Sequence, residues 1–182
     1  MTMQMAPAWQ TTAWLNTAKP LELADLRGKV VLLHAFQMLC PGCVATALPQ
    51  AKRAAQVFAG APLVVVGLHT VFEHHAVMGA EALAAFLYEY RIAFPVGIDA
   101  PGPDGDPIPR TMRAYQMQGT PTTVLIDAEG RLRRQVFGTI DDLQLGADIG
   151  RLLAEAGPAD RGFTAVGATA AGSCGPAGCA IG

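Results

Sequence analysis

Four cysteines are the residues of this 182-residue sequence whose spacing points most directly to chemistry. They form two close pairs, Cys40-Pro-Gly-Cys43 and Cys174-Gly-Pro-Ala-Gly-Cys179. Two thiols with two residues between them can form and break a disulfide with each other, although half of a zinc site has the same spacing. A chain of this length buries a core without covalent bridges, so the pairs indicate redox or metal chemistry rather than a disulfide framework.

The residues around the first pair favour redox chemistry over a zinc site. Cys40 follows an apolar run at 30–36 and precedes a segment with helical spacing, so we expect it at a helix N-terminus with Pro41 as the first helical residue. The unpaired N–H groups of a helix N-terminus stabilise a thiolate over a thiol. Cys40 is therefore predicted to be the nucleophile, and Cys43, one turn further on, the thiol that resolves the mixed disulfide.

Hydrophobic periodicity predicts the elements that hold this pair. Two nearly continuous apolar runs, 30–36 and 63–68, flank helical spacing over 43–58, which indicates a strand-helix-strand unit with both strands buried on two faces. The later elements predicted from the sequence are a helix over 83–90, a strand at 96–98, an irregular connection at 99–109, a hairpin of 122–126 and 132–137, and a helix over 145–152.

Composition predicts one folded domain with two appendages. Apolar residues make up 51% of the chain and charged residues 15%, which supports a sizeable core. We expect an N-terminal extension at 1–20, the domain at 21–157, and a Gly/Ala-rich tail at 158–182 that adds little to the core. With a net charge of −2, no long run of like charges and no apolar stretch of the ~18 residues that a membrane span needs, neither nucleic acid nor a membrane is an expected partner. Since residues 1–20 hold no secretory apolar region, a cytoplasmic location is expected.

Several segments together resemble one protein family. They are residues 23–33 (LADLRGKVVLL), the CPGC motif, 67–70 (GLHT) with Phe72-Glu73, 119–127 (GTPTTVLID) and Gly130. The chain resembles thioredoxin-fold proteins of the TlpA-like/redoxin group, which is related to AhpC/TSA. This resemblance implies an α/β fold with a central mixed sheet flanked by helices. It also implies a thiol-disulfide oxidoreductase of the protein disulfide reductase type, without an organic cofactor, acting on a disulfide-containing protein or small thiol; its electron donor is unknown.

The resemblance also assigns expectations to residues around the cysteines. It implies a cis bond between Thr120 and Pro121, with the backbone of Gly119 and Thr120 beside Cys40, where an incoming peptide pairs as an added strand. His34 stands where relatives carry a buried Asp or Asn, so it is either the base that takes the proton from Cys43 or a neutral, hydrogen-bonded core histidine.

Two further residues are expected at the edge of the site. Because the carboxyl ends of parallel strands share one edge of a sheet, His69 and Glu73 should emerge on the side of Cys40. With His74 and His75 they could also form a metal cluster, but a solvated loop is the favoured interpretation and no metal is assigned.

Two alternative functions remain open at this point. A thiol peroxidase of the redoxin group shares the fold, but such enzymes carry a threonine three residues before the reactive cysteine, where this chain has Gln37. A non-enzymatic module could instead hold zinc or copper with both cysteine pairs. The second pair, Cys174 and Cys179, is a candidate redox relay to Cys40, a metal clip, or an inert tail.

Overall fold

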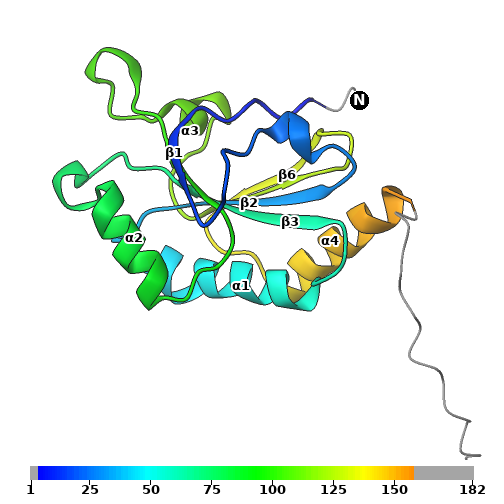
Figure 1. The fold of residues 1–182 in the computed structure, drawn as a ribbon. Coiled ribbons are helices and arrows are strands. Elements are labelled where there is room, and N and C mark those ends of the chain that lie inside the picture. Colours follow the sequence, from blue (N-terminus) through cyan, green and yellow to red (C-terminus); the bar gives the residue numbers. More distant parts are fainter. Residues whose placement is uncertain (1–3, 158–182) are drawn as a thin grey trace, which may run out of the picture.

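The computed structural model describes residues 4–157. They fold around one central six-stranded sheet (Figure 1). The strand order is β1-β4-β3-β2-β5-β6. The strands are β1 (Thr11–Leu15), β2 (Val30–Phe36), β3 (Leu63–His69), β4 (Val96–Asp99), β5 (Thr122–Ile126) and β6 (Leu132–Phe137). Strands β2, β3 and β4 are parallel, whereas β1, β5 and β6 run antiparallel to their neighbours. This is the mixed sheet that the resemblance implies.

Strand β2 lies inside the sheet because all seven of its residues, VVLLHAF, are buried. Its side chains alternate between two cores, with Leu32 and Phe36 on one face and Leu33 and Ala35 on the other. A strand that is apolar on both faces needs cover on both sides. The strand that leads into Cys40 is therefore packed on both of its faces.

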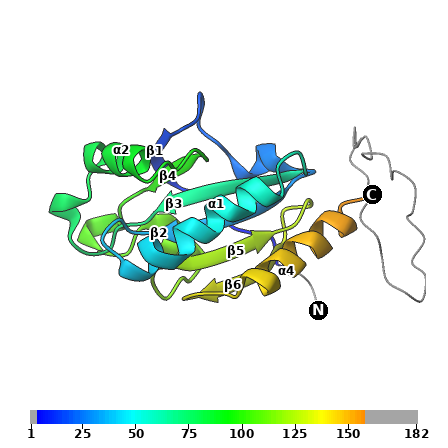
Figure 2. The same ribbon diagram turned by 90° about the horizontal axis from the view of Figure 1, so that it is seen from below.

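Helices cover the two faces unequally. Helices α1 (Leu48–Val57), α2 (Ala80–Glu89) and α4 (Asp142–Glu155) pack their apolar sides on the face that holds Phe36 (Figure 2). The opposite face is covered by the short helix α3 (Arg110–Ala114) and by the N-terminal segment with Trp9 and Trp14. None of the helices in the described part of the chain is long and apolar enough to span a membrane.

The N-terminal segment differs from the sequence prediction. The sequence predicts an extension at 1–20 that precedes the domain, but the structure places β1 in the sheet, where Trp14 pairs with Gly97 and Leu15 with Val96 of β4. A further bridge joins Met5 to Arg131. As an edge strand with only partial burial, β1 needs no continuous apolar run, and this is why its sequence carries no strong strand signal.

Helix α3 is a second difference, because the sequence predicts an irregular connection at 99–109 and no helix directly after it. With five residues it is too short to show helical periodicity. The carboxylate of Asp99, at the end of β4, accepts hydrogen bonds from the backbone N–H groups of Thr111 (2.8 Å) and Met112 (3.0 Å). A side chain 12 and 13 positions earlier thus supplies the cap that the local sequence does not.

The helix that follows the cysteine pair contains a π-helical segment, Cys43–Ala47, before α1 begins. Pro49 explains it, since proline has no N–H to donate to the carbonyl of Ala45 four residues back. The N–H of Leu48 instead reaches the carbonyl of Cys43, five residues back. The helix predicted over 43–58 is therefore present, and its first segment, Cys43–Ala47, is π-helical.

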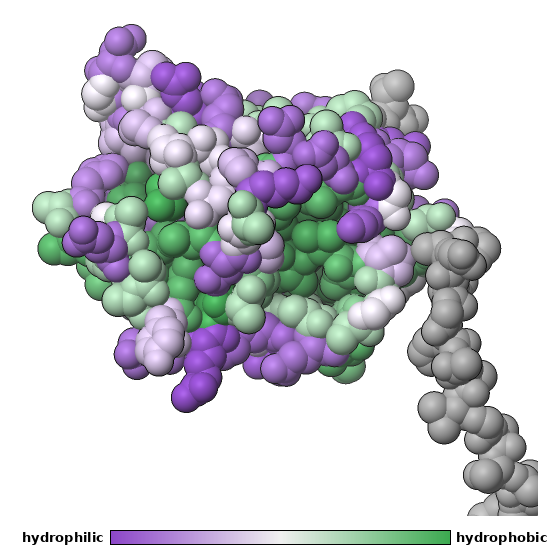
Figure 3. All heavy atoms as spheres, in the orientation of Figure 1, coloured by the Kyte–Doolittle hydropathy of each residue, from purple (hydrophilic) through white to green (hydrophobic). Residues whose placement is uncertain are grey.

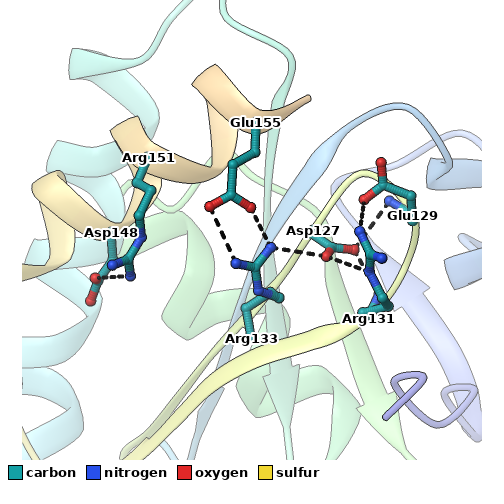
Figure 4. A network of polar contacts seen from close by, with 7 residues as sticks. All are labelled: Asp127, Glu129, Arg131, Arg133, Asp148, Arg151 and Glu155. Atoms are coloured by element: carbon teal, nitrogen blue, oxygen red, sulfur yellow. Dashed lines mark hydrogen bonds and ion pairs between the residues drawn. The ribbon is translucent and has the colours of Figure 1, made fainter. Parts of the chain in front are cut away.

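Ion pairs hold the β5–β6 hairpin and α4 together at the end of the sheet away from Cys40 (Figure 4). Asp127 accepts hydrogen bonds from the backbone N–H of Arg131 (2.8 Å) and from its guanidinium (2.9 Å), and Arg133 joins Asp127 to Glu155. Gly130 completes the turn at φ 79°, a conformation that favours glycine. The cluster ties the turn to α4 and leaves the cysteine end free of it.

Candidate active site

Cys40 lies at the carboxyl end of β2, where the chain turns into the helix. Its carbonyl accepts the N–H of Val44 at 3.1 Å, which makes Cys40 the residue that opens the helix. Cys40 is partly exposed, and its sulfur accepts the backbone N–H of Cys43 at 3.4 Å. The start of the helix therefore directs a backbone N–H at the Cys40 sulfur.

Cys43 has the opposite environment. Its side chain is fully buried, and this burial, together with the hydrogen bond to the Cys40 side chain, raises the pKa of the Cys43 thiol to about 12. Both cysteines are free thiols. At neutral pH the pair is therefore asymmetric, with an accessible sulfur over a helix N-terminus and a buried, protonated one behind it.

The 119–121 segment packs against this pair. The Thr120–Pro121 bond is cis, as the resemblance implies, and the Cys40 thiol donates to the carbonyl of Thr120 at 3.5 Å. Gly42 passes close to Pro121, because a Cβ at position 42 would lie 3.4 Å from the proline Cδ. The Gly119 carbonyl accepts the Thr122 hydroxyl at 2.7 Å. The CPGC motif thus packs directly against the Thr120–Pro121 segment.

Gln37 joins three segments around Cys40, a role that the sequence alone did not reveal. Its buried carboxamide oxygen accepts the backbone N–H of Phe72 at 3.2 Å, and its NH₂ group lies 3.4 Å from a Glu73 oxygen and 3.5 Å from the Thr120 hydroxyl. The one sequence feature that pointed to a role for Gln37 was its position three residues before Cys40. Glu73 is thus connected to the Thr120 segment through this glutamine.

His34 lies on the sheet face beneath the helix that carries Cys43. It alternates with Leu32 and Phe36, which share a core with Cys43. One ring nitrogen, Nδ1, lies 3.4 Å from the Thr123 hydroxyl, and the other, Nε2, has no hydrogen-bond partner within the described residues. Burial lowers the pKa of His34 to about 4, so the imidazole is neutral at pH 7. No hydrogen bond links it to Cys43 among residues 4–157.

The remaining predicted residues do not gather at the cysteines. His69 ends β3 with its ring buried 5.4 Å from that of Phe36, and it lines a separate cavity. His74 and His75 are exposed, and residues 4–157 contain no group of three or more His, Cys, Asp or Glu side chains suited to hold a metal. Cys174 and Cys179 lie outside the described residues.

Comparison with known proteins identifies the family. Residues 2–135 match the AhpC/TSA family. The chain belongs to it. A solved thioredoxin-like superfamily protein, SPOA0173, is 54% identical with a TM-score of 0.82, the alignment covering 85% of this chain and 99% of that one. A thiol-disulfide isomerase from Corynebacterium glutamicum is 46% identical with a TM-score of 0.77, covering 82% and 97% of the two chains.

A curated relative is much longer than this member of the AhpC/TSA family. Protein DipZ of Mycobacterium bovis is 33% identical over 133 residues, which cover 71% of this chain and 18% of DipZ. The chain therefore spans less than a fifth of that relative. Together these comparisons show a thioredoxin-fold member of the AhpC/TSA family, one of whose solved relatives is named a thiol-disulfide isomerase.

Proposed function

We propose that this protein is a protein disulfide reductase that cycles between a Cys40-Cys43 dithiol and a Cys40-Cys43 disulfide. The observation that carries the proposal is the asymmetry of the pair, with a partly exposed Cys40 that accepts a helix N–H and a buried, protonated Cys43. An accessible thiolate, here Cys40, attacks the substrate first. A buried thiol, here Cys43, reacts only after the substrate is covalently attached.

The reaction takes two exchanges. The Cys40 thiolate attacks a substrate disulfide, forms a Cys40–substrate disulfide and expels the second substrate sulfur as a thiolate. Cys43 then loses its proton and attacks the Cys40 sulfur, which closes the Cys40-Cys43 disulfide and releases the first substrate sulfur. Two electrons from an external dithiol donor restore the starting state.

A disulfide-bearing peptide is the proposed substrate, held against the backbone of Thr120. Exposed apolar side chains flank the motif, with Leu39 57% exposed directly before Cys40, and Phe137 52% exposed beside Gly119. A strand-like peptide can hydrogen-bond to an open backbone edge while its side chains contact such flanking residues. This supports a protein or peptide substrate over a free small disulfide.

His34 is the proposed proton acceptor for the second exchange. In the reduced protein the transfer is strongly uphill, since a pKa of about 12 for Cys43 and about 4 for His34 differ by about 8 pH units, or roughly 11 kcal/mol. Burial is the main cause of the raised pKa of Cys43, and a smaller part comes from its contact with the Cys40 thiol, which no longer exists once Cys40 is bound to substrate. We therefore place the transfer in the mixed disulfide and not in the resting dithiol.

Gln37 favours the reductase over the peroxidase. A peroxidatic site needs a hydroxyl beside the reactive sulfur, whereas the carboxamide of Gln37 is engaged with Phe72, Glu73 and Thr120. Turnover measured with reduced dithiothreitol as donor tests the choice. We expect insulin disulfides to be reduced in a Cys40-dependent manner and hydrogen peroxide to be consumed no faster than by the donor alone. Cys40-dependent peroxide consumption without insulin reduction would refute the proposal.

A further inference from the structure

An exposed carboxylate lies close to the backbone that is proposed to hold the substrate. Glu73 follows β3, and one of its side-chain oxygens lies 3.4 Å from the Nε2 atom of Gln37. The hydroxyl of Thr120 lies 3.5 Å from the same nitrogen, and the Thr120 carbonyl accepts the Cys40 thiol at 3.5 Å. A negative charge therefore lies beside the segment proposed to pair with an incoming peptide.

A buried residue holds the Glu73 carboxylate in place. Gln37 is 1% exposed, and its carboxamide oxygen accepts the N–H of Phe72, the residue directly before Glu73. Its NH₂ group faces the carboxylate itself. Exposed ion pairs usually contribute little because two free side chains must be ordered, and a carboxylate that is already held needs less ordering. Within residues 4–157 no lysine, arginine or histidine forms an ion pair with Glu73, so its charge is available to a substrate.

The segments around the cysteine pair carry no lysine or arginine that would offset this charge. They are joined by the contacts of Gln37, Cys40 and Pro121, and they are residues 37–42, 70–79, 115–121 and 138–141. Their other carboxylate, Asp141, is engaged as the cap of α4. At the end of the molecule that carries residues 70–79, on the left of Figure 3, hydrophilic and apolar residues lie side by side. This surface suits a peptide that combines apolar side chains with a positive charge.

We infer that Glu73 selects substrate peptides that carry a lysine or arginine close to the cysteine to be reduced. The substrate is then a basic peptide disulfide, whose cation lies against Glu73 and whose apolar side chains lie against the exposed Leu39 and Phe137. The inference rests on the proposed reductase function and adds to it the chemistry of the substrate. Glu73 is the residue that determines this specificity, and Gln37 is the residue that positions it.

The expected selection is a few fold. The two contacts of Gln37 keep the Glu73 and Thr120 oxygens no more than about 7 Å apart, and opposite unit charges at this separation in water change a rate about threefold. A lysine that reaches closer approaches the roughly fivefold effect of a well-placed surface ion pair. Salt weakens such an effect, since the Debye length falls from about 20 Å at 20 mM to about 4 Å at 0.5 M.

Reduction of matched peptide disulfides tests the inference. Each substrate is a symmetric disulfide dimer of a short blocked peptide with lysine, glutamine or glutamate near its cysteine, placed before the cysteine in one set and after it in another. The full chain is assayed for kcat/KM at low salt and pH 8, where an ordinary exposed histidine is uncharged, with dithiothreitol as donor. Each value is divided by the rate of the same peptide with dithiothreitol alone, which removes the effect of the neighbouring charge on any attacking thiolate. In at least one set we expect lysine to exceed glutamine about three- to fivefold and glutamate to fall below glutamine.

Salt and two variants assign the preference to Glu73. The ratio of lysine to glutamine should fall below about 1.5 in 0.5 M NaCl and in Glu73→Gln, which keeps an oxygen for the Gln37 amide but loses the charge. Glu22→Gln is the matched control, because it removes an exposed carboxylate before β2, at the opposite end of that strand from Cys40, and should keep the parent ratio. Equal rates for lysine and glutamine in both sets, or a lysine preference that salt or Glu73→Gln leaves unchanged, would overturn the inference alone. If no peptide is reduced faster than by dithiothreitol alone, the proposed function fails with it.

Discussion

Alkylation should separate the two active-site thiols by their rates. At pH 8 a pKa of about 12 leaves about one Cys43 in 10⁴ ionised, against about a quarter of an exposed reference thiol with a pKa of roughly 8.5. The ratio is about 2,400. A more basic thiolate is also a better nucleophile, and over about 3.5 pH units this recovers about 40-fold. Ionisation alone therefore slows Cys43 about 60-fold, and its burial slows it further.

The assay is iodoacetamide labelling of the reduced protein, quenched at intervals and read by peptide mass spectrometry. A short cysteine peptide with blocked termini, in the same tube, is the reference thiol. We expect Cys40 to be labelled first and Cys43 to lag the reference peptide by at least about 60-fold. The Cys40→Ser variant checks that the lag does not come from blocking by a modified neighbour. Labelling of Cys43 within about fivefold of the reference would refute the assignment of roles.

Three further outcomes are expected. His34 is neutral in the folded protein, with a pKa of about 4 against 6.5 when unfolded, so it contributes stability that is complete above pH 6.5 and is lost as the pH falls towards 4, by up to about 3 kcal/mol. Urea unfolding of His34→Gln should lose this contribution and keep the similar one from His69, whose pKa is also about 4. Gln37→Ala should lower the kcat of insulin reduction several fold, because the Thr120 segment loses its hydrogen bond, and should change the melting temperature by only a few degrees. An equal loss of kcat in Gln37→Asn and Gln37→Ala would argue that the two ends of the Gln37 amide do not position Phe72 and Thr120. If Cys174 and Cys179 relay electrons, their double serine variant should keep insulin reduction with dithiothreitol but lose turnover with the physiological donor, and unchanged turnover with that donor would exclude the relay.

The part of the site that the sequence predicts is the part built from local signals. The apolar run of β2, Pro41 and the spacing of the two cysteines lie within fourteen residues, and each carries its own physical reason. The hairpin followed equally from its turn residues and Gly130. These elements stand where periodicity and turn chemistry place them.

Other features depend on contacts between distant residues. β1 is a strand because β4 offers it an edge, and α3 is capped by Asp99 from the preceding strand. The hydrogen bonds of Gln37 to Phe72 and Thr120 likewise join residues 35 and 83 positions apart. Periodicity does not encode such contacts, and the resemblance to the thioredoxin fold supplied the placement of the Thr120–Pro121 segment.

The position of His69 at the end of its strand was predicted correctly, but its place beside the cysteines was not. Its position at the carboxyl end of β3 was predicted, but a residue at that end can face either side of the sheet or the neighbouring strand. Here the ring is buried against Phe36 and lines the cavity beside α2, so it stands apart from the cysteines. Which cavity a side chain lines depends on packing that strand periodicity leaves open.

The most direct test of the proposed reaction is a trapping experiment with the Cys43→Ser variant. The reduced variant is mixed with insulin, quenched with acid, and digested without reduction for mass spectrometry. We predict a stable Cys40–insulin disulfide that does not form with Cys40→Ser and does not accumulate with the parent protein, which resolves it. Parent-level release of reduced insulin by Cys43→Ser, or a linkage formed through Cys43 in the Cys40→Ser variant at the same rate, would contradict the roles assigned to the two cysteines.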